Sequence, residues 1–270
     1  MKIYILDSGW IECDANRMVN YTTVATNSNR DVKHKWIKIP VWSLLIEHPQ
    51  AGYIIYDFSR SPQEDFTLIP QRVQELFPYY WHEQQNMQTQ LAGLGLQATD
   101  IKTAVLSHFH FDHMGNAPLF VHCELYVPKL DFANAKAITS ATDDIEEHGS
   151  YIKKYVELPF KKITLVEPDK DVEIFPGITL LNLPGHTPGL LGLMVELKES
   201  GTLIFPSDAI YTAENYGPPV RASGNIYDSL AFFASIEKIR ALQKKKNAKI
   251  IFSHDMSCFQ ALKKAPEYYD

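Results

Sequence analysis

Short apolar runs separated by polar turns dominate the sequence, and runs of this length and composition predict β-strands. The runs are Val41–Ile46, Tyr53–Tyr56, Thr103–Leu106, Leu125–Val127, Ile178–Leu183, Leu190–Leu197, Thr202–Phe205 and Lys249–Phe252. The turn-forming sequence HPQAG, at 48–52, lies between the first two runs. We therefore expect these two strands to form a hairpin.

Helical patterns are fewer. Apolar residues recur at three-residue steps from Leu230 to Leu242, after the capping residue Asp228 and before a run of lysines that suits the carboxyl end of a helix. Two further helices are expected, over His82–Leu94 and Thr142–Tyr155. Strands early and late in the chain with helices between them predict an α/β layered fold. We expect a single domain, 1–270, built from two similar halves, roughly 1–140 and 141–270.

Composition and charge narrow the functional classes. The chain has 270 residues, 45% of them hydrophobic, which is enough for a large core, and a net charge of -6 argues against nucleic acid or anionic membranes as partners. No apolar run has the length of a membrane span or of a signal-peptide core, so we expect a cytoplasmic protein. Cys13, Cys123 and Cys258 are odd in number and far apart, which favours reduced thiols over disulfides or a thiolate zinc site.

Side chains that can bind a metal follow four of the predicted strands. The strand TAVL leads into His108, ITLLNL into His186, TLIF into Asp208 and KIIF into His254. In layered α/β folds the carboxyl ends of strands collect at one edge, where sites form. Residues that are far apart in the sequence are therefore expected to converge there.

The sequence HFHFDH, at 108–113, supplies ligands in two directions. His108 and His110 point to the same side of an extended segment, so both imidazoles can reach one ion. Asp112 and His113 follow where the chain turns and suit a second ion, while the two oxygens of Asp208 allow it to be shared. The expected shells are His108, His110 and His186 for one ion and Asp112, His113 and His254 for the other, with Asp208 between them. Such ligands suit zinc, and manganese, iron and cobalt are the alternatives.

The remaining histidines are isolated in the sequence: His34, His48, His82, His122 and His148. A lone histidine is more often a surface or core residue than a ligand, so they receive no metal role. Within the motif itself, we expect Phe109 to pack in the core and Phe111 to line the wall of a pocket.

HFHFDH resembles the HxHxDH motif of the metallo-β-lactamase superfamily. The segments LPGHTPG (183–189) and FSHD (252–255) and the strand end at Asp208 are similar to its other ligand motifs, in the same order, so the resemblance covers residues 40–255. It implies an αββα sandwich, two mixed β-sheets flanked by helices, with a dinuclear site at one edge.

Within this superfamily the chain is most similar to the N-acyl homoserine lactonases, which degrade quorum-sensing signals. Asp208-Ala-Ile-Tyr211 resembles their Asp-x-x-Tyr, and Met18 falls near a methionine of their lactone pocket. The resemblance implies a small-molecule substrate, an N-acyl homoserine lactone, bound near Met18, Phe111 and Tyr211. Alternatively, Tyr211 only packs its aromatic ring beneath the site and has no catalytic role.

Two features depart from that family. Asp57-Phe58-Ser59 stands where relatives carry Asp-Thr-Gly, which leaves Asp57 able to orient a ligand histidine but changes the turn. The aromatic-rich segment 61–95, part of an insertion-like stretch at about 60–97, aligns poorly. Acyl-chain binding, internal packing and an interface of a homodimer are the open interpretations of that segment.

The implied reaction uses a hydroxide that bridges two metal ions and is available near neutral pH. It attacks the lactone carbonyl, Tyr211 donates a hydrogen bond to the developing oxyanion, and Asp112 carries a proton to the departing alkoxide. The alternatives are another hydrolase of this fold, phosphotriesterase-like or glyoxalase II-like, and a non-catalytic binder of acyl ligands.

Overall fold

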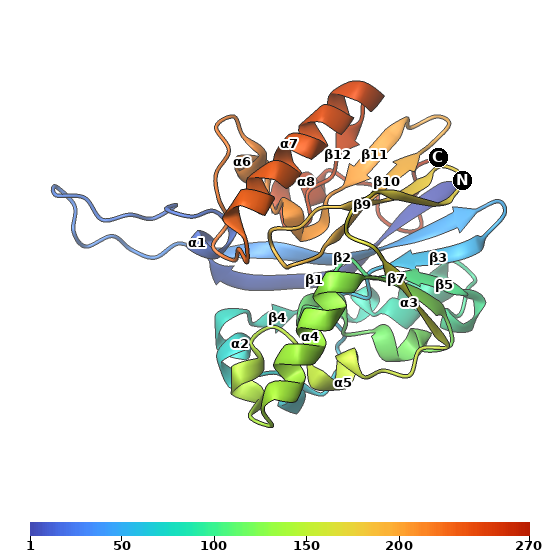
Figure 1. Ribbon diagram of the computed structural model, residues 1–270, viewed down its shortest axis with the longest axis horizontal. Helices are drawn as coiled ribbons and strands as arrows, with labels where there is room; N and C mark the ends of the chain where they lie inside the picture. The colour runs from blue at the N-terminus through green and yellow to red at the C-terminus, as the bar shows by residue number, and fades with distance from the viewer.

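The computed structural model describes residues 1–270 as two β-sheets packed against each other between two layers of helices (Figure 1). The strands are β1 (Lys2–Asp14), β2 (Trp36–His48), β3 (Gly52–Tyr56), β4 (Tyr79–Tyr80), β5 (Thr103–Val105), β6 (Glu124–Pro128), β7 (Lys162–Val166), β8 (Val172–Phe175), β9 (Ile178–Asn182), β10 (Leu191–Glu196), β11 (Thr202–Phe205) and β12 (Lys249–Ile250). The first sheet has the order β4-β1-β2-β3-β5-β6-β7 and the second has the order β12-β11-β10-β9-β8.

The helices cover the outer faces of both sheets. The α-helices are α1 (Ala15–Met18), α2 (Gln71–Leu76), α3 (Met87–Gly93), α4 (Lys129–Ala141), α5 (Lys153–Val156), α6 (Ala213–Tyr216), α7 (Ser229–Lys246) and α8 (Met256–Gln260). The 3₁₀ turns are η1 (Phe66–Leu68), η2 (Glu83–Gln85), η3 (Ala98–Asp100), η4 (Phe111–His113), η5 (Ala117–Phe120), η6 (Ile145–His148) and η7 (Ser207–Ala209). Figure 1 shows α4 and α7 on opposite sides of the two sheets.

Apolar side chains fill each of the three spaces between these layers. Alternate residues of a strand point to opposite faces of its sheet. In β1, Ile3 and Ile5 therefore belong to the core between the sheets, whereas Tyr4 and Leu6 belong to the core beneath the first helix layer. A third cluster joins β9, β10 and β11 to α7. The αββα sandwich expected from the sequence is confirmed.

The predicted hairpin and the longest predicted helix are present, but one face of the helix differs from the expectation. β2 and β3 pair with His48 opposite Gly52. The Asp228 carboxylate caps α7 by accepting the N–H of Ala231 at 3.0 Å. A stripe of three-residue steps drifts around a helix of 3.6 residues per turn. Leu230 is consequently 82% exposed, and Phe232, which lies off the stripe, is buried instead.

Two helix predictions are wrong because polar side chains and special backbone angles interrupt them. Within 142–155 only η6 and α5 form, since Thr142 is extended and Gly149 has a φ of 59°. Within 82–94 the helix breaks at Asn86, which is extended and whose side chain accepts the N–H groups of Gln88 and Thr89. Asparagine side chains compete in this way with the helical hydrogen bonds of the backbone.

Two elements lack a recognisable signal in the sequence. β1 contains a change of register between Asp7 and Trp10, so its alternation is interrupted. Gly9 lies in that interval with a φ of 97°, and a Cβ there would meet the Tyr80 carbonyl oxygen at 2.3 Å. In α4 the buried residues are Asp131, Ala135 and Thr139, which form no apolar stripe.

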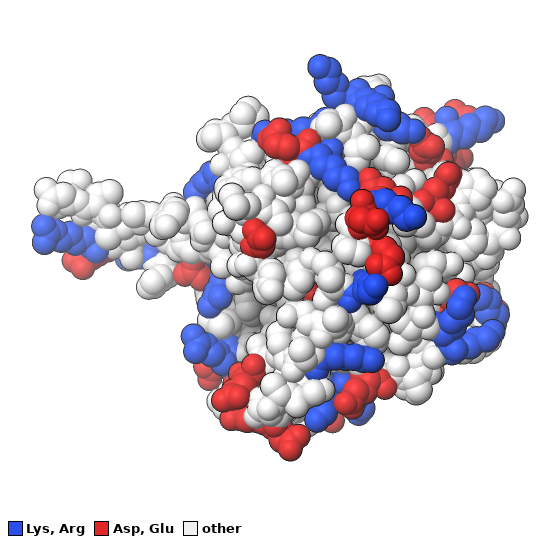
Figure 2. Space-filling view, in the orientation of Figure 1, with Lys and Arg blue, Asp and Glu red and all other residues white.

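A long arm leaves the body of the molecule. Residues 21–35, between α1 and β2, extend away from the sheets (Figure 1), and Tyr21 is 80% exposed. Figure 2 shows both basic and acidic side chains toward the end of this arm. No helix of the chain combines the length and apolarity needed to cross a membrane. Residence in the cytoplasm and a homodimer stay predictions.

Candidate metal centre

The metal-binding side chains expected at the strand ends converge at one edge of the two sheets. β5 ends just before His108, and η4, immediately after it, carries Asp112 and His113. The loop after β9 carries His186, η7 after β11 carries Asp208, and the chain beyond β12 reaches His254. Two clusters result, one of His108, His110 and His186 and the other of Asp112, His113, Asp208 and His254.

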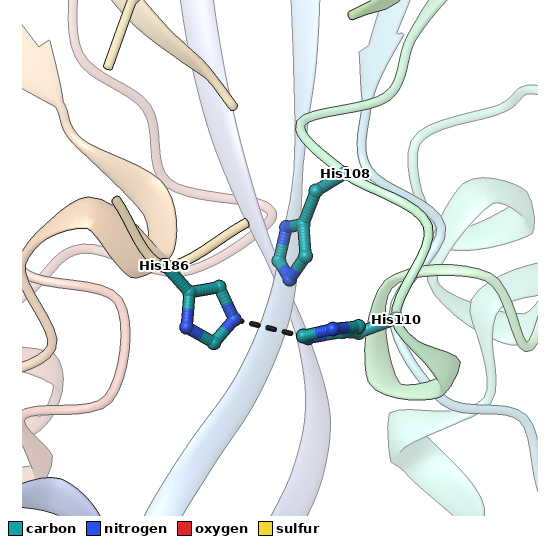
Figure 3. A group of neighbouring side chains, drawn as sticks. All are labelled: His108, His110 and His186. Atoms are coloured by element: carbon teal, nitrogen blue, oxygen red, sulfur yellow. Dashed lines mark hydrogen bonds between the residues drawn. The ribbon is translucent and has the colours of Figure 1, made fainter. Parts of the chain in front are cut away.

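The first cluster consists of imidazoles alone. Figure 3 shows the His108, His110 and His186 rings pointing toward one another, and His186 Nε2 lies 3.0 Å from His110 Nδ1. Burial holds the pKa of His108 and of His110 well below the ordinary value and also lowers the pKa of His186. The rings are therefore neutral at physiological pH, which is the form that binds a metal.

The carboxylates in and behind the second cluster create a negative electrostatic potential there. Burial acts to lower the pKa of His113, but the carboxylates of Asp208 and Asp57 outweigh burial and raise this pKa well above its ordinary value. Burial likewise acts to raise the pKa of Asp208, yet His254 and His113 hold it well below the usual range. A field that stabilises an imidazolium also stabilises a metal cation in the same place.

Asp208 lies between the two clusters. Its Oδ2 atom is 3.6 Å from His108 Nε2 and 3.5 Å from His186 Nε2 on one side. On the other side Oδ2 is 3.4 Å from His113 Nε2, and Oδ1 is 3.2 Å from His254 Nε2. The carboxylate therefore faces ring nitrogens of both clusters, as expected of a shared ligand.

The donor set fits metal ions because its inward-facing atoms have no protein partner. The buried atoms His108 Nε2, His113 Nε2 and Asp208 Oδ1 make no hydrogen bond. Leaving such atoms buried and unpaired costs about 1–3 kcal/mol each, which an ion at the centre removes. Imidazole nitrogens that have given up their proton and carboxylate oxygens are ligands of zinc and related divalent ions.

Hydrogen bonds from the opposite ring nitrogens set the histidine tautomers. His254 Nδ1 lies 3.0 Å from the Pro40 carbonyl oxygen, and His186 Nδ1 lies 3.0 Å from that of Asn225. Carbonyl oxygens only accept, so these Nδ1 atoms carry the hydrogen and the Nε2 atoms keep a free lone pair. The outer partners thus aim the rings inward.

Asp57 makes the contact that its sequence position suggested. Its Oδ2 atom lies 2.8 Å from His113 Nδ1, and its two oxygens also accept hydrogen bonds from the Ser107 N–H and hydroxyl. The residue has a φ of 58°, so the altered turn at 57–59 still delivers a carboxylate to the histidine. Asp57 therefore holds the His113 ring by its Nδ1 atom, with Nε2 directed toward the second cluster.

A cavity opens beside the centre, and its lining combines apolar side chains with the metal-binding ones. It is lined by Ile11, Met18, Ile39, Phe77, His110, Phe111, Asp112, Ser150, His186, Asp208, Tyr211, Asn225 and His254. Met18 and Phe111, predicted to contact substrate, are both in this lining. Phe109 instead stacks on Phe132 in the core, as predicted, with ring centres 5.0 Å apart. Phe77 belongs to the segment 61–95, for which acyl-chain binding was one interpretation. Ile11 and Ile39 were missed, because β1 was not anticipated and the predicted strand at 41–46 began after Ile39.

Tyr211 lies against the first cluster and also lines the cavity. Its hydroxyl oxygen is 3.1 Å from His186 Nδ1, whose hydrogen is directed to Asn225. Burial raises the pKa of Tyr211 well above its ordinary value, so the hydroxyl stays protonated. The hydroxyl hydrogen is therefore available to a group that enters the cavity.

Asp131 supports the ligand loop and was not anticipated. This fully buried carboxylate of α4 accepts the Phe109 N–H at 2.7 Å and the Tyr151 hydroxyl at 2.8 Å. The Tyr151 ring in turn meets the His110 ring edge-on, with centres 4.9 Å apart. An aspartate in the first turn of a helix is usually a surface residue, so the sequence offers no sign of this role.

The Asp131→Asn variant should change how stability depends on pH. Burial raises the pKa of Asp131 to about 7, so between its ordinary value and about 7 the folded protein binds a proton that the unfolded chain has lost. The contribution of Asp131 to stability therefore falls as pH rises through this window. Relative to wild type, the free energy of unfolding of the variant should improve by about 2 kcal/mol from pH ~5 to ~8. Urea unfolding of both proteins in chelator measures this.

The matched control is Asp143→Asn, because Asp143 is fully exposed. Its free energy of unfolding should follow that of the wild type at every pH. If the free energy of unfolding changed with pH by the same amount in Asp131→Asn and in wild type, Asp131 would have the same pKa in the folded and unfolded chains, contrary to the prediction.

Comparisons with known proteins agree with this geometry. Residues 37–254 match the model of the metallo-beta-lactamase superfamily. The N-acyl homoserine lactonase AiiB of Agrobacterium fabrum is 33% identical over 274 residues, which cover 98% of each chain. A solved N-acyl homoserine lactone hydrolase, with the product N-hexanoyl-L-homoserine bound at its catalytic metal centre, is 25% identical and superposes with a TM-score of 0.81 over 99% of this chain and 98% of that one. A variant of AiiA from Bacillus thuringiensis with bound N-decanoyl-L-homoserine gives the same TM-score, identity and coverage.

Proposed function

The chain belongs to the metallo-β-lactamase superfamily and, within it, to the N-acyl homoserine lactonases, and from this premise we propose that it opens the lactone ring of N-acyl homoserine lactones. The observation that carries the proposal is a cavity whose lining joins apolar side chains to the imidazoles and carboxylates of the centre. Such a cavity suits a substrate with a polar ring at one end and an aliphatic chain at the other.

The fold and the two clusters imply bound metal ions. We assign two divalent ions, with zinc preferred for this ligand set. His108, His110 and His186 would hold one ion, Asp112, His113 and His254 would hold the other, and Asp208 lies where it could serve both. The unpaired ring nitrogens and the position of Asp208 support this assignment.

The metals, when bound, polarise the lactone carbonyl and lower the pKa of water, which provides a nucleophile near neutral pH. The protein residues have separate tasks. The Tyr211 hydroxyl donates a hydrogen bond to the carbonyl oxygen as negative charge develops on it. Asp112 lines the cavity, where its carboxylate would take the proton released by the attacking water and pass it to the alkoxide that leaves when the ring opens. The product is an N-acyl homoserine.

The substrate preference tests the function. The metal-loaded protein should hydrolyse N-acyl homoserine lactones at least about 100-fold faster, in kcat/KM, than nitrocefin, lactoylglutathione or paraoxon, since about 3 kcal/mol of transition-state discrimination is ordinary for a matched site. Titration of released acid measures lactone opening. The same preparation after chelation is the control and should be inactive. Faster turnover of the thioester or the phosphotriester would replace the proposal with a glyoxalase II-like or phosphotriesterase-like activity.

A further inference from the structure

Arg17 is a cation without a carboxylate partner at the edge of the cavity. It belongs to α1, and the next residue, Met18, lines the cavity wall. Its guanidinium carbon lies 5.8 Å from the centre of the Phe77 ring, and Nη1 lies 3.4 Å from Asn225 Oδ1. Phe77 and Asn225 line the cavity as well, so the guanidinium sits over its rim.

Three of the six arginines pair with a glutamate; of the other three, Arg30 and Arg72 are exposed, whereas Arg17 is half-buried. Arg60 pairs with Glu64, and Arg221 pairs with Glu214 at 2.7 Å. The arginine–carboxylate pairs within 4.0 Å are those of Arg60, Arg221 and Arg240, so no carboxylate lies that close to the Arg17 guanidinium. Of its five N–H groups, one makes a side-chain hydrogen bond, and that bond is long. Most of its donors are therefore free for a ligand.

The backbone holds Arg17 in this position. Its carbonyl oxygen accepts the Gly224 N–H at 2.9 Å, and a Cβ on Gly224 would come within 2.8 Å of the Arg17 Cα atom. The neighbouring Asn225 carbonyl oxygen binds His186 Nδ1 at 3.0 Å. Asn225 thus contacts both the guanidinium and a histidine of the metal centre.

The cavity lining includes no lysine or arginine, and Met18, Phe77 and Phe111 are among the apolar side chains on which an acyl chain can lie. A substrate that places its lactone at the metal centre and its aliphatic tail on those side chains carries its carbonyl oxygens between the two. A 3-oxoacyl amide has two carbonyl oxygens in a 1,3 relation, which can turn to the same side. The planar fork of a guanidinium presents two parallel N–H groups that match such a pair.

On the proposed lactonase function, we infer that Arg17 is a specificity-determining residue that binds the two carbonyl oxygens of a 3-oxoacyl chain and so favours 3-oxoacyl homoserine lactones. The wild-type enzyme prefers N-(3-oxohexanoyl) over N-hexanoyl homoserine lactone. The contact forms in the ground state and in the transition state alike, so its loss appears in KM more than in kcat.

The test compares kcat and KM for these two lactones in wild type, Arg17→Met and Arg17→Lys. Methionine keeps the packing on Phe77, and lysine keeps the charge but not the fork. Arg17→Met should lose about 10- to 100-fold in kcat/KM on the 3-oxo lactone, mostly through KM, the size expected for charge-assisted hydrogen bonds. Its loss on the hexanoyl lactone should be under about threefold, within the spread of changes at non-contacting positions. Arg17→Lys should fall between wild type and Arg17→Met.

Arg221→Met is the matched control, because it removes the same charge from the same corner of the molecule, where Arg221 contacts the Asn20 carbonyl oxygen. It should leave the preference between the two lactones unchanged. Calorimetric binding of the product N-(3-oxohexanoyl) homoserine gives a second readout and should weaken by the same factor in Arg17→Met. Equal losses on both lactones, or product binding that does not change, would overturn the assignment. A wild-type protein that opens neither lactone would instead overturn the proposed function.

Discussion

Asp208→Ala is expected to lose at least one of two bound metal ions and most of the activity. Asp208 faces ring nitrogens of both clusters at 3.2–3.6 Å, so in the proposed assignment alanine would remove a ligand from each ion at once. Loss of a residue that only supports a ligand typically costs about 10- to 100-fold in affinity or activity, and loss of the shared ligand should exceed that range. Elemental analysis after gel filtration, with kcat/KM on the same sample, measures both effects.

Asp171→Ala is the control for this experiment. Asp171 is a partly exposed aspartate that pairs with Lys238 on the second sheet's outer side, away from both clusters. This variant should retain full metal content and activity, which separates loss of a ligand from loss of any carboxylate. An Asp208→Ala protein that keeps two ions and wild-type activity would exclude Asp208 as a shared ligand.

Tyr211→Phe is expected to lower kcat about 100-fold while the metal content stays intact, since loss of one oxyanion donor typically costs about 10²–10³-fold. The hydroxyl stays protonated because burial raises the pKa of Tyr211, and its oxygen is the one polar atom that the substitution removes. KM should change little, because the hydrogen bond strengthens as negative charge develops on the carbonyl oxygen. Steady-state kinetics on a metal-quantified sample measure the change.

Tyr155→Phe provides the same chemical change at a distance from the centre. Tyr155 is also a buried tyrosine, but its hydroxyl bonds to Glu64 beneath the helices of the first sheet. The Tyr155→Phe variant should have a lower free energy of unfolding and an unchanged kcat. If Tyr211→Phe retained the wild-type kcat, Tyr211 would be a packing residue only.

The arrangement of the centre was predictable because the fold places strand ends together. A histidine or aspartate directly after an apolar strand has its position fixed by the sheet, and this holds for His108, Asp208 and His254. The core sheets were predictable for the same reason, since buried strands are continuous apolar runs.

The residues that the sequence did not reveal depend on tertiary contacts. Asp131 becomes a loop support only because α4 packs beneath the ligand motif, and its local sequence looks like that of an exposed helix start. The break at Asn86 depends on a side-chain cap that competes closely with continued helix. Arg17 acquires its place from the contact of α1 with Gly224, which is more than two hundred residues away in the sequence.

Each of the two clusters combines side chains that follow strands of both sheets. His108, His110, Asp112 and His113 follow β5 of the first sheet, whereas His186, Asp208 and His254 follow strands of the second. Metal ions bound here would cross-link the two sheets at one edge. Anything that binds only the folded state adds RT ln(1 + [L]/Kd) to stability, about 4 kcal/mol at a free concentration 1,000 times Kd. The catalytic ions would thus also act as a staple that holds the halves of the sandwich together.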